Sequence, residues 1–219
     1  MILVPVKNLA QAKQRLSVAM PQSARTRLAQ AMLLDVLSAI SEWGGMPCSV
    51  VTGDKYGCDL ARRLSMKIIH DAENPGETWA IERATRVCVE EGCESTLVLP
   101  ADIPLITPGE LELIAKHAPE KGTLLVPAGD GRGTNAAYRS PADLFPLRFG
   151  NDSFKPHLAA AQALGSPCVV LQLPGIAVDV DGPEDLHQLA SLPGETEAQQ
   201  FARAYLCGAD LSPTGTDQL

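Results

Sequence analysis

Short apolar runs along the chain alternate with longer stretches in which apolar residues recur at helical spacing. The short runs predict buried strands, and the helical spacing predicts helices with one face in a core. The predicted strands cover residues 2–5, 48–52, 66–70, 96–99, 123–127, 135–139, 168–173 and 176–180. The predicted helices cover residues 22–43, 56–64, 77–91, 108–118, 153–164, 183–192 and 195–206.

This alternation of strand and helix predicts an α/β fold, with a mainly parallel mixed sheet that is flanked by helices on both faces. The sequence contains no internal repeat, no shift in composition and no linker. We therefore predict one domain over residues 1–206, followed by a disordered polar tail over residues 207–219.

Aspartates follow two of the predicted strands. Asp102 comes after strand 96–99, between two prolines that stop the strand from continuing. Asp179 and Asp181 lie at the end of strand 176–180. Carboxyl ends of strands line the ligand crevice of an open α/β sheet, and carboxylate oxygens are ligands for Mg²⁺ that holds phosphates. The sequence therefore favours a magnesium site, although either Asp102 or Asp181 alone is equally well explained as a helix cap.

A basic loop, defined by Lys7, Lys13 and Arg15, comes directly after the first predicted strand. It matches neither of the two commonest nucleotide-binding fingerprints, the Walker loop and the Gly-x-Gly-x-x-Gly turn. Three cations here would suit a triphosphate and would balance charge on a departing pyrophosphate. The alternative is a solvated basic turn.

Glycines alternate along residues 129–133 and are followed by Thr134 and Asn135. Glycine permits close backbone approach to an anion, so this loop is a candidate anion-binding nest. The alternative is an ordinary hairpin turn, which also favours Asp-Gly.

A second polar segment, with Gly150, Asp152 and Ser153, leads into the predicted helix 153–164. A helix start can hold a carboxylate or phosphate. Alternatively, Ser153 or Asp152 is simply an N-cap. His157, just inside the helix, fits a packing role and a ligand contact equally well.

Charge and cysteine content narrow the class of protein. With 26 acidic and 18 basic residues the formal charge is −8, and no basic cluster suited to nucleic acid is present. The apolar start is too short for a signal peptide or a membrane span. Six cysteines show no Cys-x-x-Cys pair or zinc-ligand spacing, so we interpret them as buried thiols of a cytoplasmic protein.

Five motifs, taken in order, resemble those of the 2-phospho-L-lactate guanylyltransferase family. They are K-N-L-A-x-A-K-x-R-L, L-P-A-D-I-P-L, G-T-N-A, R-F-G-N-D-S-F-x-x-H and D-V-D-G-P-E-D-L. That family includes the phosphoenolpyruvate guanylyltransferases of deazaflavin coenzyme biosynthesis, and the likeness runs from about Leu3 to Leu189. It implies a nucleotidyltransferase fold and activation of a three-carbon phospho-acid with GTP as co-substrate and Mg²⁺.

The resemblance also implies roles for single residues. It makes Asp102, Asp179 and Asp181 the magnesium ligands, and it places Lys7 on a phosphate of nucleotide or substrate. The reaction itself, rather than the resemblance, assigns Lys7, Lys13 and Arg15 to the charge on the departing pyrophosphate. The expected contacts of the phospho-acid are Thr134, Asn135, Gly150 and Ser153.

One segment departs from the family pattern. Where the family usually has Gly-Leu-Asn at the start of the third helix, this chain has Gly-Glu-Thr, ending at Thr78. If the asparagine holds nucleotide, the base or ribose contacts must differ here. The sequence therefore leaves open a related nucleotidyltransferase with another acceptor, such as 3-phosphoglycerate or a sugar phosphate, and a non-catalytic nucleotide-binding relative.

Two kinds of protein partner are compatible with this chain. A guanylylated enolpyruvate would be labile in water, which favours coupling to the downstream transferase. The long apolar helices are compatible with a homodimer, but the sequence identifies no patch for it.

Overall fold

A mixed seven-stranded sheet forms the centre of the computed structural model, which describes residues 1–71, 76–150 and 152–209. Its strands, in the order β3-β2-β1-β4-β6-β5-β7, are β3 (Lys67–His70), β2 (Cys48–Thr52), β1 (Ile2–Val6), β4 (Thr96–Val98), β6 (Thr134–Ser140), β5 (Gly122–Pro127) and β7 (Cys168–Val170). Only β6 runs antiparallel to its neighbours, β4 and β5. The predicted α/β fold with a mainly parallel mixed sheet is confirmed.

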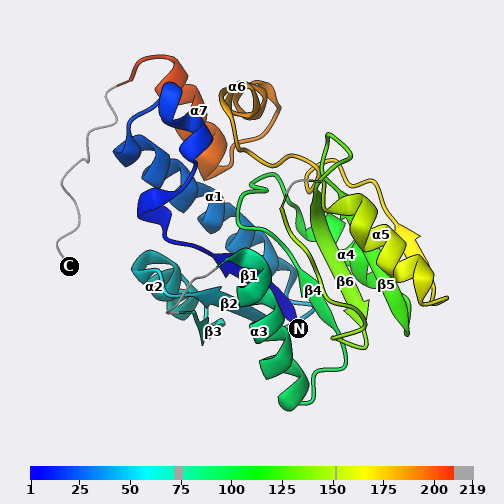
Figure 1. Cartoon of the computed structure of the whole chain (residues 1–219). Coiled ribbons are helices and arrows are strands. Elements are labelled where there is room, and N and C mark those ends of the chain that lie inside the picture. Colours follow the sequence, from blue (N-terminus) through cyan, green and yellow to red (C-terminus); the bar gives the residue numbers. More distant parts are fainter. Residues whose placement is uncertain (72–75, 151, 210–219) are drawn as a thin grey trace.

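Helices cover both faces of this sheet (Figure 1). One face is covered by α1 (Gln22–Trp43), α2 (Lys55–Arg63) and α4 (Pro108–His117). The helices α6 (Pro183–Ser191) and α7 (Glu197–Leu206) extend the same core, with α7 packed on α1 and α6. The other face packs on α3 (Glu77–Glu90) and α5 (Phe154–Ala163).

The alternation of side chains along β1 explains why two cores form. Ile2, Val4 and Val6 enter the core on the α1 side, whereas Leu3 enters the core on the α3 side. Successive side chains of a strand point to opposite faces, so an uninterrupted apolar run marks a strand that is covered twice.

The topology brings several chain segments to one edge of the sheet. Parallel strands β1 and β4 end there, followed by Lys7 and Asp102, and antiparallel β6 begins there with Thr134. Two short 3₁₀ turns, η1 (Leu9–Gln11) and η2 (Gln14–Val18), fold the segment after β1 back over this edge.

The predicted strand 176–180 is wrong, because residues 174–177 form a turn and 178–180 are irregular. The backbone bonds there are isolated: Gly129 N donates to Ala177 O at 2.8 Å, and Val180 N donates to Asp102 O at 3.2 Å. Ile176 and Val180 are both fully buried. Both side chains pack in the hydrophobic core, although their backbone is not part of a strand ladder.

The predicted C-terminal tail, residues 207–219, lies mostly outside the described residues. Residues 207–209 continue past α7, with Cys207 N bonded to Arg203 O, and the remaining residues 210–219 lie outside the described part of the chain. Among the residues described, no helix combines the length and the hydropathy needed to cross a membrane.

Candidate active site

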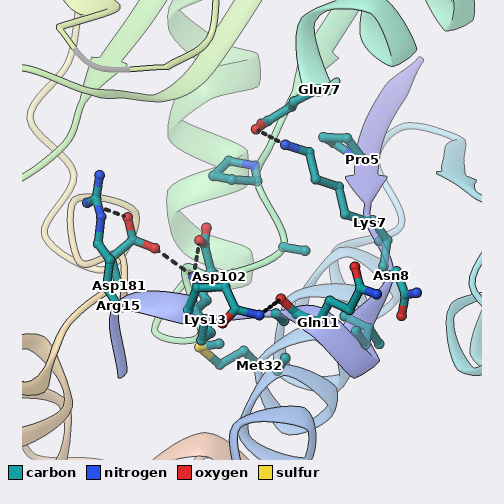
Figure 2. Close-up of a pocket in the computed structure, with 17 residues that line it drawn as sticks. Pro5, Lys7, Asn8, Gln11, Lys13, Arg15, Met32, Glu77, Asp102 and Asp181 are labelled. Carbon is teal, nitrogen blue, oxygen red and sulfur yellow. Dashed lines mark hydrogen bonds and ion pairs between the residues drawn. The ribbon is translucent and has the colours of Figure 1, made fainter. Parts of the chain in front are cut away.

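A cavity of about 510 Å³ lies at the edge of the sheet where β1 and β4 end (Figure 2). Its walls come from the basic loop, from the segment after β4, from the first turn of α3 and from the segment before α6. The predicted site residues among its walls are Lys7, Lys13, Arg15, Asp102 and Asp181. The structure thus brings together the basic loop and two of the three predicted metal ligands.

Lys13 is the centre of this cavity's charge network. Its ammonium donates to Asp102 Oδ2 and, at 2.9 Å, to Asp181 Oδ1. Its side chain is only 9% exposed, against 28% for Asp102 and 43% for Asp181. One buried cation is therefore shared by two carboxylates that reach it from distant parts of the sequence.

The local backbone fixes Lys13 in this position. It lies between η1 and η2 with φ 54° and ψ 49°, a left-handed conformation that is uncommon for residues other than glycine. Arg25 of α1, itself buried, donates to Lys13 O at 3.4 Å and to Gln14 Oε1 at 3.0 Å. Leu16 is fully buried and anchors η2 in the core.

The network holds Lys13 and Asp181 in their charged forms. Burial lowers the pKa of Lys13, but the carboxylates of Asp102 and Asp181 outweigh burial and raise that pKa above its usual value. Burial likewise acts to raise the pKa of Asp181, yet Lys13 and Arg15 bring it below the usual range. Lys13 is therefore an ammonium and Asp181 a carboxylate at neutral pH.

Two further cations border the cavity and are more exposed. Arg15 Nη1 lies 3.3 Å from Asp181 Oδ2, and Lys7 Nζ lies 3.8 Å from Glu77 Oε2. Their side chains are 67% and 56% exposed, so both heads can turn towards a bound anion. Glu77 was not anticipated from the sequence; burial, then the charge of Asp102, raises its pKa.

Asp179 is placed differently from the other two predicted metal ligands. Asn135 Nδ2 donates to Asp179 Oδ1 at 3.0 Å and to Ile176 O at 2.9 Å. Burial raises the pKa of Asp179; the Asn135 bond opposes this, and the charges of Asp102 and Asp181 add to it. Asn135, predicted as a phospho-acid contact, thus uses its amide to hold a carboxylate.

The residues present fit a magnesium ion only in part. Within the described ranges, no three or more histidine, cysteine, aspartate or glutamate side chains form a group that could hold a metal, so the predicted triad is not assembled here. However, Mg²⁺ is usually bound by one or two carboxylates together with substrate phosphates. Asp102 and Asp181, which already share one cation, provide such a pair.

The glycine-rich loop is a hairpin turn. Asp130 Oδ1 accepts from Arg132 N at 2.8 Å and from Gly133 N at 3.3 Å, while Gly129 N and Gly131 N donate to backbone oxygens. These amides already have acceptors, which favours the hairpin alternative over the anion nest. The loop joins antiparallel β5 and β6, as the hairpin alternative predicted.

Thr134 and Ser153 do come together, as expected for residues that share a ligand. Their hydroxyl oxygens are 3.3 Å apart, and Thr134 Oγ1 lies 2.9 Å from His157 Nδ1. Ser153 occupies the N-cap position of α5, but its side chain makes no capping bond. The N-cap explanation for the Ser153 side chain is therefore wrong.

Thr78 contacts the segment that precedes Gly150. Phe149 N donates to Thr78 Oγ1 at 3.0 Å, and the Thr78 hydroxyl lies 3.4 Å from Phe149 O. Gly150 has φ +130°, a conformation that side-chain-bearing residues rarely adopt. Thr78, which stands where the family usually has asparagine, therefore lies next to the predicted acceptor contact Gly150.

Comparisons with known proteins identify the family of this chain. The family model for CofC-like guanylyl transferases matches residues 1–218. The phosphoenolpyruvate guanylyltransferase of Rubrobacter xylanophilus is 36% identical, over 88% of this chain and 94% of that protein. The 3-phospho-D-glycerate guanylyltransferase of Colwellia psychrerythraea is 32% identical, over 87% of this chain and 91% of that protein. The 2-phospho-L-lactate guanylyltransferase of Methanothermobacter thermautotrophicus is 31% identical, over 92% of this chain and 88% of that protein.

A solved structure supports the fold independently. A nucleotidyl transferase of Methanothermobacter thermautotrophicus superposes with a TM-score of 0.59 at 17% identity, over 93% of this chain and 99% of that one. The family match along nearly the whole sequence, with relatives more than 30% identical over most of its length, shows that the chain belongs to the CofC-like guanylyl transferase family.

Proposed function

We propose that this protein transfers GMP from GTP to the phosphate of a three-carbon phospho-acid and releases pyrophosphate. The proposed acceptors are phosphoenolpyruvate and 2-phospho-L-lactate, and the proposed setting is deazaflavin coenzyme biosynthesis in the cytoplasm. The observation that carries the proposal is the cavity in which the basic loop faces Asp102 and Asp181. The names of the relatives support the choice of nucleotide and acceptor.

The chemical problem is to bring two polyanions together. Two unit charges about 4 Å apart repel by about 4 kcal/mol at an effective dielectric constant near 20. An acceptor phosphate oxygen is already anionic at neutral pH, so it can attack the α-phosphorus of GTP without a general base. Positioning and charge neutralisation are then the tasks left to the protein.

The basic loop fits these tasks. Lys7 and Arg15 are exposed at the border of the cavity and can pair with phosphate oxygens. Lys13 is fixed by Asp102 and Asp181 and presents a permanent positive charge to the cavity. These three cations would bind the triphosphate and stabilise charge on the departing pyrophosphate.

Magnesium would supply further neutralisation between the nucleotide and acceptor phosphates. Asp102 and Asp181 would hold it. Asp179, proposed as a third ligand, would have to move towards them, because the three carboxylates do not form one group here. Asn135 then orients Asp179 through the bond to its Oδ1.

The acceptor would bind on the side of Thr134, Gly150 and Ser153. Two hydroxyl groups meet there, and they suit the carboxylate and phosphate of a small phospho-acid. A second acceptor, 3-phosphoglycerate, is favoured by the Colwellia psychrerythraea relative, whose identity to this chain is similar to that of the 2-phospholactate enzyme.

The test is pyrophosphate release from GTP and Mg²⁺ with phosphoenolpyruvate, 2-phospholactate or 3-phosphoglycerate, in parallel. The downstream transferase of the pathway is included to trap a labile product, and ATP and CTP serve as nucleotide controls. We expect release with GTP and one of the first two acids. Release only with 3-phosphoglycerate would replace the acceptor, and no release with any acid would overturn the proposed function.

A further inference from the structure

His157, Thr134 and Ser153 form a row of hydrogen-bonded polar groups behind the predicted acceptor side. Their residues are 1%, 5% and 4% exposed, so water reaches them poorly. His157 Nδ1 lies 2.9 Å from Thr134 Oγ1, which lies 3.3 Å from Ser153 Oγ. Polar groups this deeply buried need partners of the correct donor or acceptor type.

The backbone decides which nitrogen of His157 carries the proton. Arg148 N lies 2.8 Å from His157 Nε2, and a backbone N–H can only donate. Nε2 must therefore accept, so the proton of the neutral ring is on Nδ1. Nδ1–H in turn donates to Thr134 Oγ1.

A count of protons then shows what the row can offer to a ligand. His157 Nδ1, the Thr134 hydroxyl and the Ser153 hydroxyl bring three protons, and the two bonds between them use two. Because His157 donates at one end, the remaining hydroxyl proton points out of the row. The Thr134–Ser153 pair is thereby set as a hydrogen-bond donor, which suits an anionic group.

The same histidine fixes the neighbouring loop. Three consecutive backbone amides donate to three different side chains: Leu147 to Glu82, Arg148 to His157, and Phe149 to Thr78. The next residue is Gly150, one of the predicted acceptor contacts. His157 thus holds both the loop and the hydroxyl pair, one with each ring nitrogen.

We propose that His157 is a positioning residue for the acceptor: its neutral ring fixes the Arg148 amide and polarises the Thr134–Ser153 pair as a donor to an anionic group of the phospho-acid. This inference rests on the proposed function. It assigns no contact between His157 and the acceptor, because both ring nitrogens already have partners.

Two substitutions of His157 test its bond to Thr134 and its bond to the Arg148 amide one at a time. In His157→Asn the side-chain amide reaches the position of Nδ1 and keeps a donor for Thr134, but it loses the acceptor for Arg148. In His157→Gln the amide reaches the position of Nε2 and keeps that acceptor, but it loses the donor. We expect the acceptor KM to rise about tenfold or more in each variant, which corresponds to about 1.4 kcal/mol, with the GTP KM unchanged.

The matched control is His117→Asn on α4, where the histidine is exposed and lies far along the helix from the sheet edge. A merely structural role would lower the active fraction and leave both KM values unchanged. A readout that needs no turnover is the tautomer of His157 in the unsubstituted protein, from ¹⁵N NMR of histidine-labelled material. The expected form is Nδ1–H.

The outcomes are distinct. The Nε2–H tautomer would overturn the inference, whatever the activity. In an active unsubstituted protein, acceptor KM values in both variants that equal the unsubstituted value would overturn it and leave the proposed function intact. Failure of the unsubstituted protein to release pyrophosphate with any acid would overturn the proposed function, and the acceptor role of His157 with it.

Discussion

The ammonium of Lys13 donates a 2.9 Å hydrogen bond to Asp181 Oδ1, although the two residues are 168 positions apart in the sequence. The same ammonium also donates to Asp102, so it joins the segment after β4 to the segment before α6. Without this cation the two carboxylates would face one another with no shared positive charge. Lys13 therefore contributes both to the assembly of the site and to its charge.

Lys13→Met tests this contribution. Methionine keeps the length and apolar stem of lysine but removes the charge, so we expect kcat/KM for GTP to fall by about 10²-fold or more. Initial rates of pyrophosphate release measure this loss, and a thermal melt shows whether the variant is folded. Lys116→Met, at an exposed position of α4, is the matched control. An unchanged kcat/KM in folded Lys13→Met would contradict the assignment.

Asp102→Asn tests the proposed metal site. Asparagine has nearly the same shape as aspartate but has lost the negative charge, so we expect weaker Mg²⁺ binding and loss of most turnover, while the fold is retained. Mn²⁺ binding in the presence of GTP, followed by electron paramagnetic resonance, reports the site without turnover. Asp143→Asn, at an exposed position in the loop after β6, is the control. Equal Mn²⁺ binding and equal turnover in both variants would exclude Asp102 as a ligand.

Periodicity of apolar residues predicted most of the fold, because a strand that is covered on both faces must be apolar throughout. The same signal failed at residues 176–180. Ile176 and Val180 are as buried as any strand residue, yet their segment is a turn followed by irregular chain. An apolar segment indicates burial. Whether that segment is a strand depends on whether its backbone forms hydrogen bonds with a neighbouring strand.

The candidate site was predictable where a residue type follows a strand end, as for Lys7 and Asp102. Pairings across the fold were not predictable, since no local pattern connects Lys13 with Asp181 or Thr78 with Phe149. The anion-nest interpretation of the glycine-rich loop is disfavoured for another reason. Its amides are satisfied by Asp130, a residue of the loop itself, and so the loop does not offer them to a ligand.

Thr78→Val tests which substrate the departure at this position affects. Valine removes the hydroxyl that accepts from Phe149 N, so one backbone amide before Gly150 loses its partner. We expect the acceptor KM to rise by about two- to tenfold, with the GTP KM unchanged. Thr78→Ser keeps the hydroxyl and should behave as the unsubstituted protein. A rise in the GTP KM alone would place Thr78 on the nucleotide side instead.

The burial of His157 predicts how the free energy of unfolding depends on pH. Burial, followed by the charge of Arg139, lowers the pKa of His157 to about 4, whereas an unfolded histidine titrates near 6.5. Between these values the unfolded chain binds a proton that the folded chain does not, so the free energy of unfolding falls as the pH drops from about 6.5 to 4. At pH 5 the loss from this residue is about 2 kcal/mol. Urea unfolding at pH 7.5 and pH 5 should show this extra loss in the unsubstituted protein and in the His117→Asn control, but not in His157→Gln. The same pH dependence in His157→Gln would mean that His157 is not held neutral in the folded protein.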